Sequence, residues 1–374
     1  MKNNKSIFWC KNCAMPSTRP RISFDQNGCC NACLWSFKKK KIDWKKRIYT
    51  LKKLLNTYKS EVDFNCLVPV SGGKDGSYVA YNLKHKYKMR PLAVTATPPL
   101  QLDTGLKNIK NFVNSGYDLL GVDANMKAMQ KINKSGFIEV GFPYFGWLIA
   151  IHTVVLRVAV KFNINLIFYG EDGEVEYGGN PQNIETPLYD FKYMKKIYLE
   201  NFYERVMAKS NLKNNEDYFF RFPEELNNST IANKLSVTHW SYFENWDPYK
   251  NYIIAKKYCG LEESKKNNLG TFTNFAQNDQ ALVALHTYLM YLKFGFGRAT
   301  ADACIEVRRG AMDRNQAISL IKLYDGKFPE EFLDLYLDYF KIKKNMFFDV
   351  LYKHSNKSLF ERKQNNFIPK FKII

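Results

Sequence analysis

The sequence predicts an α/β fold: a parallel sheet that is preceded by a small cysteine-rich module and followed by a mostly helical C-terminal region. Three observations lead to this prediction. Five of the eight cysteines lie within the first 33 residues. Short apolar runs alternate with helical patterns between residues 64 and 169, which favours parallel strands joined by right-handed crossovers. After residue 281, apolar side chains recur at helical spacing. For a chain of 374 residues we expect three domains, which span residues 1–40, 41–205 and 206–374.

The N-terminal cysteines have the spacing of a metal site. Cys10 and Cys13 form one C-x-x-C pair, Cys30 and Cys33 form another, and sixteen residues separate the two pairs. This spacing is typical of a zinc ion held by four thiolates. Cys29 neighbours Cys30, but only Cys30 keeps the two-residue gap to Cys33. We therefore expect the first domain to be a zinc ribbon, with redox-active or simply buried cysteines as the alternatives.

A second motif follows the apolar run at residues 64–70, which is typical of a buried parallel strand. Residues 71–77 are Ser-Gly-Gly-Lys-Asp-Gly-Ser, and a helical pattern begins directly afterwards. Adjacent glycines allow close approach of an anion, and the start of the helix directs free N–H groups and its positive dipole end to the same place. We expect a phosphate-binding turn with Lys74 as an added cation. The Walker spacing is absent, and a glycine-rich turn without a ligand is the alternative.

This turn resembles the SGG-x-DS signature of the PP-loop ATP pyrophosphatases, which cleave ATP between its α and β phosphates. The matching residues are Ser71, Gly72, Gly73, Asp75 and Ser77, with Gly76 inserted before the last of them. The resemblance implies that these residues bind ATP together with Lys74 and with Thr95 in the next strand. A Mg²⁺ ion near Asp75 would help to neutralise the departing pyrophosphate.

An acidic, glycine-rich loop follows the strand that we predict at residues 166–169. It spans residues 170–181 and contains Glu171 and Glu176. Because ligands of open α/β sheets bind just beyond the carboxyl ends of the strands, we expect this loop to face the same crevice as the phosphate turn. Its carboxylates are suited to holding Mg²⁺, or to accepting hydrogen bonds from ammonia or a substrate. An exposed acidic loop without a ligand is the alternative.

Other elements are expected from local patterns. Asp43 is placed to cap a helix whose apolar side chains continue to Tyr58. The aromatic-rich segment 238–249 suits either core packing, which we favour, or a surface that stacks on sugars. Further strands and helices are predicted at residues 91–96, 106–114, 119–122 and 147–162.

The C-terminal region contains one candidate ligand-binding residue. Residues 293–302 place Arg298 on a glycine-flexed loop between two predicted helices. An arginine can hold a phosphate or a carboxylate through two hydrogen bonds, so we take Arg298 as a candidate substrate-binding residue. The helices predicted in this region start near Ala281, at the capping box of Asp313 and Gln316, and at Pro329.

The composition is strongly basic. The chain has 56 Lys and Arg residues against 36 Asp and Glu, which gives a formal net charge of +20. This charge favours a polyanionic ligand or partner or a membrane surface, or it reflects a lysine-rich composition alone. No apolar run follows the basic first residues, so we expect no signal peptide. The most apolar stretch, residues 144–160, contains His152 and Arg157, so we expect a buried helix in a cytoplasmic protein without a membrane span.

Together these motifs resemble the N-acetyl sugar amidotransferases of bacterial surface-polysaccharide and flagellin-glycan synthesis. The segments that carry the resemblance are residues 10–33, 71–77, 171–179 and 295–302. The resemblance implies conversion of a sugar acetamido group to an acetamidino group, with ATP giving AMP and pyrophosphate. It implies a nucleotide-linked N-acetyl sugar as substrate, and structural Zn²⁺, ATP and Mg²⁺ as cofactors. Ammonia would come from a separate glutaminase and cyclase-like pair.

The same resemblance suggests roles for individual residues. Lys74 and Asp75 would act on the phosphates, and Glu171 or Glu176 would orient ammonia and remove its proton after attack. Tyr177 would join Arg298 in binding the substrate. Gly76 and the doubled Cys29-Cys30 depart from the family pattern, and the sequence assigns them no function.

Two other functions compete with this interpretation. A PP-loop tRNA thiolase is disfavoured because no C-x-x-C follows the phosphate turn, and Cys259 and Cys304 lie far apart in the sequence. A zinc-ribbon protein that binds nucleic acid through its positive charge is the second alternative, and we consider nucleic acid the less expected partner.

The chain shows no glutaminase nucleophile, since residue 2 is Lys and Cys259 lacks a G-x-C-x-G elbow. Ammonia must therefore come from another chain or from solution.

Overall fold

A five-stranded parallel sheet forms the centre of the protein. The computed structural model describes residues 7–59, 63–189, 191–213 and 215–373. The strand order is β3-β2-β1-β4-β5, so the chain reverses its direction across the sheet between β1 and β4. The strands are β1 (Cys66–Pro69), β2 (Pro91–Ala96), β3 (Leu119–Val122), β4 (Leu166–Tyr169) and β5 (Ser236–His239). This reversal creates the position where open α/β sheets bind their ligands.

The strand predictions agree closely with the structure. Strands β2, β3 and β4 have the predicted bounds, and β1 is shorter than the apolar run that predicted it. Strand β5 was not expected, because its residues, Ser-Val-Thr-His, do not form a continuous apolar run and the last two belong to the aromatic-rich segment. It pairs with β4 in parallel, with Leu166 opposite Ser236. The sheet therefore takes its last strand from beyond residue 205.

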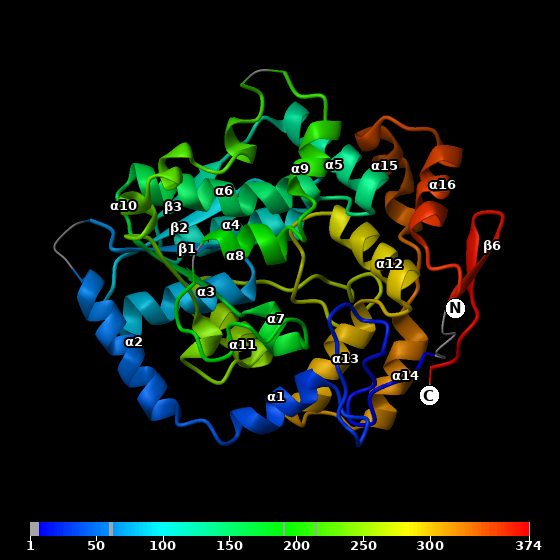
Figure 1. Ribbon diagram of the computed structural model, residues 1–374, viewed down its shortest axis with the longest axis horizontal. Helices are drawn as coiled ribbons and strands as arrows, with labels where there is room; N and C mark the ends of the chain where they lie inside the picture. The colour runs from blue at the N-terminus through cyan, green and yellow to red at the C-terminus, as the bar shows by residue number, and fades with distance from the viewer. Residues whose placement is uncertain (1–6, 60–62, 190, 214, 374) are drawn as a thin grey trace.

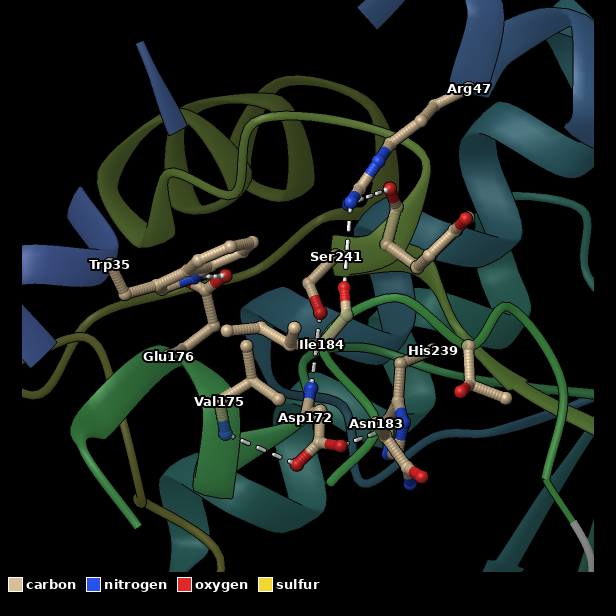
Figure 2. A pocket seen from close by; sticks show the side chains of 11 residues that line it. Trp35, Arg47, Asp172, Val175, Glu176, Asn183, Ile184, His239 and Ser241 are labelled. Atoms are coloured by element: carbon tan, nitrogen blue, oxygen red, sulfur yellow. Dashed lines mark hydrogen bonds and ion pairs between the residues drawn. The ribbon is translucent and has the colours of Figure 1, made fainter. Parts of the chain in front are cut away.

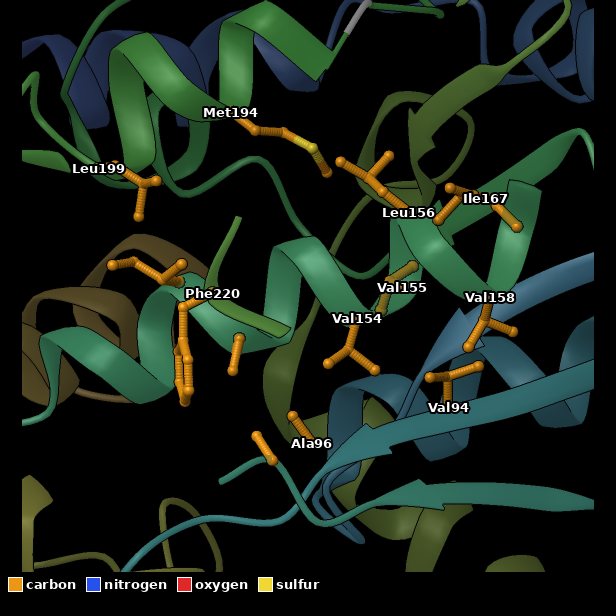
Figure 3. Close-up of a cluster of buried hydrophobic side chains, with 14 of the residues drawn as sticks. Val94, Ala96, Val154, Val155, Leu156, Val158, Ile167, Met194, Leu199 and Phe220 are labelled. Atoms are coloured by element: carbon orange, nitrogen blue, oxygen red, sulfur yellow. The ribbon is translucent and has the colours of Figure 1, made fainter. Parts of the chain in front are cut away.

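Helices cover both faces of the sheet (Figure 1). Val94 and Ile167 pack against Val154, Val155 and other apolar side chains of α6 (Phe145–Lys161), as Figure 3 shows. The neighbouring strand residues point to the opposite face, where Ala93, Leu166 and Phe168 pack with α3 (Lys74–Tyr81) and α2 (Trp44–Tyr58). Burial of both faces explains why β1, β2 and β4 are continuous apolar runs in the sequence.

The apolar helix α6 is a core element, as expected. His152 and Arg157 are both buried, and the Arg157 guanidinium donates a hydrogen bond of 2.9 Å to the Arg221 carbonyl. Within the described ranges, no helix is both long and apolar enough to span a membrane.

The remaining elements form the N-terminal module and the C-terminal region. Asp43 caps α2 through a hydrogen bond from the Lys46 amide, as predicted. Other elements of the first two thirds are α1 (Asn31–Lys39), α4 (Asp103–Asn114), α5 (Met126–Val140), α7 (Gly173–Tyr177), α8 (Phe191–Tyr193), α9 (Tyr203–Lys209), α10 (Ser229–Ala232) and α11 (Pro248–Cys259), with short π- or 3₁₀-turns η1 (Asn82–Lys86), η2 (Met194–Tyr198), η3 (Tyr218–Phe220), η4 (Glu224–Asn227) and η5 (Trp240–Tyr242).

The C-terminal region is mostly helical, as predicted. The capping box of Asp313 and Gln316 is present. Arg298 does not lie on a loop but is the first residue of a helix. Gly295 ends the preceding helix, and Gly297 is the N-cap of the helix that Arg298 begins. The elements are α12 (Leu282–Phe294), α13 (Arg298–Arg309), α14 (Arg314–Tyr324), η6 (Glu330–Phe332), α15 (Leu333–Phe340), α16 (Lys344–His354) and a hairpin of β6 (Phe360–Lys363) and β7 (Asn366–Pro369).

Most aromatic residues of the segment 238–249 are in the core, in agreement with the interpretation that we favoured, although Tyr249 is exposed. Trp240 and Phe243 are at most 1% exposed, and Trp246 is 5% exposed. All three pack beneath α3, where Tyr78 makes edge contacts with both tryptophans. The segment therefore supports the helix that follows the phosphate turn.

Gly76 has a structural reason that the sequence did not reveal. A Cβ atom at this position would lie 2.5 Å from the Pro69 carbonyl oxygen, which is far inside van der Waals contact. Only glycine therefore lets the first turn of α3 approach the end of β1 this closely.

Replacing Gly76 by Ala should destabilise the protein by roughly 1–3 kcal/mol, because the added methyl group must push α3 away from β1. Chemical denaturation followed by circular dichroism measures this change. Gly121→Ala is the matched control, since a Cβ there would meet Thr95 at an ordinary 3.8 Å. Equal stability of the two variants would contradict the close approach.

Candidate functional site

The phosphate turn and the acidic loop meet at the carboxyl edge of the sheet. The turn joins β1 to α3, and the loop joins β4 to α7, so the two segments lie on adjacent strands at the reversal point. A Cβ on Gly170 would lie 3.2 Å from the Asp75 Cβ, which shows direct contact between the two segments. The predicted shared location is thus present in the structure.

The turn has the features of an anion site. Gly72 has a φ of +77°, and a Cβ there would lie 2.7 Å from the Ile109 amide nitrogen, so both its conformation and its packing require glycine. Helix α3 starts at Lys74, and the first N–H groups of a helix have no partner within it. The Ser77 hydroxyl is buried without a hydrogen-bond partner among the described residues. These groups fit the oxygens of a phosphate chain.

The two charged residues of the turn form an ion pair. The Lys74 ammonium contacts one Asp75 carboxylate oxygen, and the Asn251 side chain donates to the other at 3.1 Å. Asn251 lies on α11, which packs against α3. Asp75 is therefore held at the mouth of the turn, with a carboxylate available as an oxygen ligand for Mg²⁺.

Glu171 is the acidic residue that faces this ion pair. Burial and, to a smaller degree, the charge of Asp75 raise the pKa of its carboxyl group to about 7, while Lys74 opposes the shift. The Tyr177 hydroxyl donates a hydrogen bond of 3.1 Å to Glu171 Oε1. A carboxylate with a pKa close to neutrality is suited to accept a proton from a reacting group and to release it again.

The other carboxylates of the loop have structural partners. Asp172 caps α7 by accepting hydrogen bonds from the amides of Glu174 and Val175. Glu174 binds Arg21, and Glu176 accepts a 2.9 Å hydrogen bond from the Trp35 indole. Glu171, in contrast, interacts with the charges of Asp75 and Lys74 in the phosphate turn.

A polar network that sequence reasoning missed lies behind the loop. His239 Nε2 lies 3.0 Å from the Tyr189 hydroxyl and 3.1 Å from that of Tyr198, and Tyr198 also donates to Asp172 at 3.3 Å. Burial lowers the pKa of His239 to about 3, so the imidazole is neutral. A cavity of about 20 Å³ adjoins Asp172, His239 and Ser241 (Figure 2). It has room for roughly one water, so this network supports the loop and does not bind a sugar.

Two predicted residues lie apart from the turn and loop contacts. Thr95 is partly exposed near the carboxyl end of β2, the strand next to β1. The Arg298 Nε donates to both Asp302 carboxylate oxygens, at 2.9 and 3.0 Å. No hydrogen bond or ion pair between described residues connects Arg298 to the phosphate turn.

The four predicted cysteines form one buried cluster, and Cys29 is not part of it. The Cys10 and Cys33 sulfurs are 3.8 Å apart, those of Cys13 and Cys30 are 3.7 Å apart, and all four lie within 4.8 Å of one another. A tetrahedral zinc ion with bonds of about 2.3 Å places its sulfur ligands about 3.8 Å apart. The donor set and its spacing therefore fit structural zinc.

Helix α13 packs directly on this cluster. The Cys304 thiol donates to the Cys13 carbonyl at 2.7 Å, and Arg308 Nη1 lies 3.7 Å from Cys13 Sγ. A guanidinium at this distance offsets part of the negative charge that four thiolates carry. The N-terminal cysteine-rich module is thus joined to the C-terminal region as well as to the acidic loop.

Comparison with known protein families found a match for the C-terminal region. Residues 269–372 match the model for the C-terminal domain of LPS biosynthesis proteins like WbpG. The chain carries a WbpG-like C-terminal domain. This match confirms the resemblance to N-acetyl sugar amidotransferases, the family of WbpG. A search of curated proteins found no significant match to the chain.

The WbpG-like domain contains Arg298 and all of α12 to α16. Its helix α13 supplies the contacts to the cysteine cluster, and the segment before α12 contacts α4: a Cβ on Gly105 would lie 2.6 Å from the Asp279 Cα. Since α4 also packs against Gly72, the WbpG-like domain lies next to the helix that supports the phosphate turn.

Replacing Cys30 by Ser should abolish stoichiometric zinc binding and lower the melting temperature, because one of four ligands to a closed site is lost. Cys29→Ser is the matched control, since its thiol lies outside the cluster and should leave the metal content unchanged. Metal analysis of the purified variants measures both outcomes. Loss of zinc from the Cys29 variant alone would exclude the proposed ligand set.

Proposed function

We propose that this protein is an ATP-dependent amidotransferase that converts the acetamido group of a nucleotide-linked sugar to an acetamidino group in bacterial surface-glycan synthesis, either LPS O-antigen or flagellin glycan. The observation that carries the proposal is the position of Glu171, whose pKa is near 7 and whose carboxyl group interacts with the charges of Asp75 and Lys74 in the phosphate turn, in a chain with a WbpG-like domain. This arrangement combines an anion site with a proton acceptor.

The first half of the reaction activates the acetamido group. Resonance makes an amide carbonyl a poor target for ammonia, whose attack would have to expel oxide. Attack of the carbonyl oxygen on the α-phosphorus of ATP forms an O-adenylated imidate, which keeps the acetamido proton on its nitrogen, and releases pyrophosphate. We assign the turn amides, Lys74 and Ser77 to the phosphates, and Thr95 to the nucleotide. Mg²⁺ held by Asp75 would neutralise charge on the pyrophosphate, because phosphoryl transfer depends on positioning and electrostatics.

The second half replaces the activated oxygen by nitrogen. Ammonia attacks the imidate carbon and forms a tetrahedral adduct whose new nitrogen carries an extra proton, which we assign to Glu171. The electron pair freed on this nitrogen then forms the C–N double bond, the bond from carbon to the AMP oxygen breaks, and AMP leaves with the electron pair of that bond. The hydrogen bond from Tyr177 keeps the Glu171 carboxylate oriented. A proton acceptor with a pKa near the working pH suits this step.

The remaining assignments follow the contacts of each residue. Glu176 was a candidate catalytic carboxylate, but its bonds to Trp35 and Lys39 favour a positioning role. Arg298 remains the candidate for the anionic part of the substrate, together with Tyr177. Zinc at the cysteine cluster would be structural. Ammonia would come from a glutaminase and cyclase-like partner pair.

The structure gives a reason to disfavour the tRNA thiolase alternative. The two cysteines near the phosphate turn are Cys66 in β1 and Cys259 in α11, and both are at most 1% exposed. Burial raises the pKa of the Cys259 thiol to about 11 and raises that of Cys66 as well. A persulfide carrier needs an accessible thiolate, and burial of this kind opposes one.

Incubation of the purified protein with ATP, Mg²⁺, ammonium and a panel of nucleotide-linked N-acetyl sugars tests the function. We expect AMP, pyrophosphate and a sugar of lower mass, in which NH replaces oxygen. Lys74→Ala should remove pyrophosphate release. Glutamine should not replace ammonium unless a partner glutaminase is added. Glutamine-dependent turnover by the single chain would exclude a separate ammonia source, and a lack of product with every acetamido sugar would exclude the substrate class.

The pH profile tests the assignment of Glu171. A base must be deprotonated, so activity should be present above its pKa and be lost as the pH falls through about 7. Tyr177→Phe removes a hydrogen bond that stabilises the carboxylate, so it raises the pKa and should move the acidic limb of kcat to higher pH. Tyr189→Phe, which alters a hydroxyl on the His239 network, is the control. An unchanged acidic limb in Tyr177→Phe would contradict the assignment.

A further inference from the structure

We propose that Trp35 and Lys39 of the N-terminal module are positioning residues for Glu171, so that the cysteine-rich module completes the candidate active site. The inference rests on the proposed function for its activity measurements. It concerns residues that neither the sequence motifs nor the family match singles out.

Glu176 receives both of its strong contacts from α1. The Trp35 indole donates to Oε1 at 2.9 Å, and the Lys39 ammonium contacts Oε2 at 2.6 Å. The side chains of this ion pair are 11% and 5% exposed for Lys39 and Glu176. Figure 2 shows Trp35 above Glu176 at the edge of the small cavity. A buried ion pair of this kind is costly to break from one side, because the remaining charge loses its compensation.

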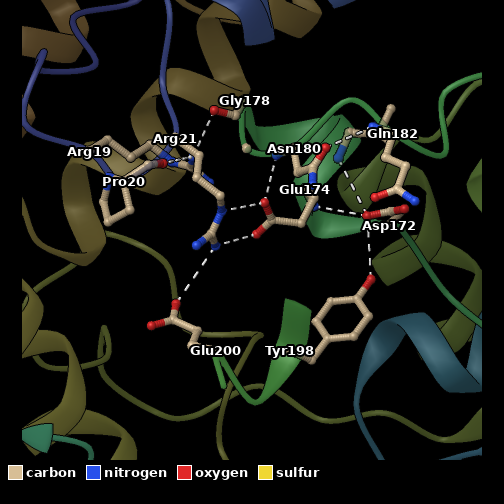
Figure 4. Close-up of polar contacts among 12 residues, drawn as sticks. Arg19, Pro20, Arg21, Asp172, Glu174, Gly178, Asn180, Gln182, Tyr198 and Glu200 are labelled. Atoms are coloured by element: carbon tan, nitrogen blue, oxygen red, sulfur yellow. Dashed lines mark hydrogen bonds and ion pairs between the residues drawn. The ribbon is translucent and has the colours of Figure 1, made fainter. Parts of the chain in front are cut away.

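A second set of contacts holds residues on both sides of Glu176 (Figure 4). Arg21 forms two hydrogen bonds with Glu174, of 2.8 and 2.7 Å. Arg19 donates to the Gly178 carbonyl at 2.8 Å. Gly178 has a φ of +84°, and a Cβ there would lie 2.8 Å from Asn31 Oδ1. The module therefore contacts α7 along its whole length.

These contacts reach Glu171 through α7. The helix has five residues, and a helix this short gains little stability from its own hydrogen bonds. Tyr177 follows Glu176 directly and donates to Glu171 at 3.1 Å. When α1 fixes Glu176, it also fixes the hydroxyl that orients the candidate base. Loss of this anchor should disturb Glu171 and leave the phosphate turn intact, since the turn is built on β1 and α3.

Helix α1 offers a matched control. Lys38 precedes Lys39 and pairs with Glu185 at 2.9 Å, but these side chains are 54% and 63% exposed. Exposed ion pairs contribute little to stability. The variants Lys38→Met and Lys39→Met therefore remove the same charge from adjacent residues, one exposed and one buried.

The experiment measures kcat and KM for ATP, zinc content and hydrogen exchange of residues 170–181 in both variants. We expect Lys39→Met to lower kcat roughly 10- to 100-fold with an unchanged KM for ATP and full zinc content, because a small displacement of a catalytic group costs this much. Exchange in the loop should accelerate. Lys38→Met should match the wild type in every readout, and Lys39→Arg should restore most of the rate.

Further variants keep the inference testable if Lys39→Met does not fold. Trp35→Phe removes the indole donor and preserves the packing, and it should lower kcat in the same way. Lys39→Met combined with Glu176→Gln should be no slower than Lys39→Met alone, because the two residues act as one pair. Wild-type rates and loop exchange in both Lys39→Met and Trp35→Phe would overturn the inference. An inactive wild type would instead count against the proposed function, and loop exchange would then decide the positioning role alone.

Discussion

The arrangement of the site depends on the buried ion pair between Glu176 and Lys39. This pair connects α1, close to the cysteine cluster, with α7 at the carboxyl edge of the sheet. Breaking a buried pair from one side typically costs about 3–5 kcal/mol, a large part of the stability of an average domain. The N-terminal module and the sheet are therefore not independent units joined by a linker. Lys39 of the module and Glu176 of α7 compensate each other's buried charge.

The C-terminal region extends this dependence to the rest of the chain. Helix α13 binds the backbone of Cys13 through Cys304, while the segment before α12 packs on α4 beside the phosphate turn. The three regions thus meet around one edge of the sheet. A single edge that is contacted from three sides can exclude water from a reacting centre, which strengthens electrostatic interactions there.

The sequence predicted those features whose causes are local. Strands β2 and β4 were found because burial on both faces leaves uninterrupted apolar runs, and the cysteine cluster was found because its two pairs repeat a fixed spacing. Strand β5 was missed because Ser236, Thr238 and His239 interrupt its apolar pattern. The partner of Glu176 and the reason for Gly76 were missed for another reason. Both depend on atoms that only the folded chain brings close: Lys39, 137 residues away, and the Pro69 carbonyl.

The contact between Cys304 and Cys13 joins residues 291 positions apart, which has a consequence for synthesis on the ribosome. At roughly 5–20 residues per second, about 15–60 s pass between the addition of Cys13 and that of Cys304. During this interval the cysteines have emerged, but the helix that covers them does not yet exist. Capture of a metal ion by the nascent module would protect its thiols from oxidation until α13 arrives. Metal supply during translation would then set the yield of folded protein.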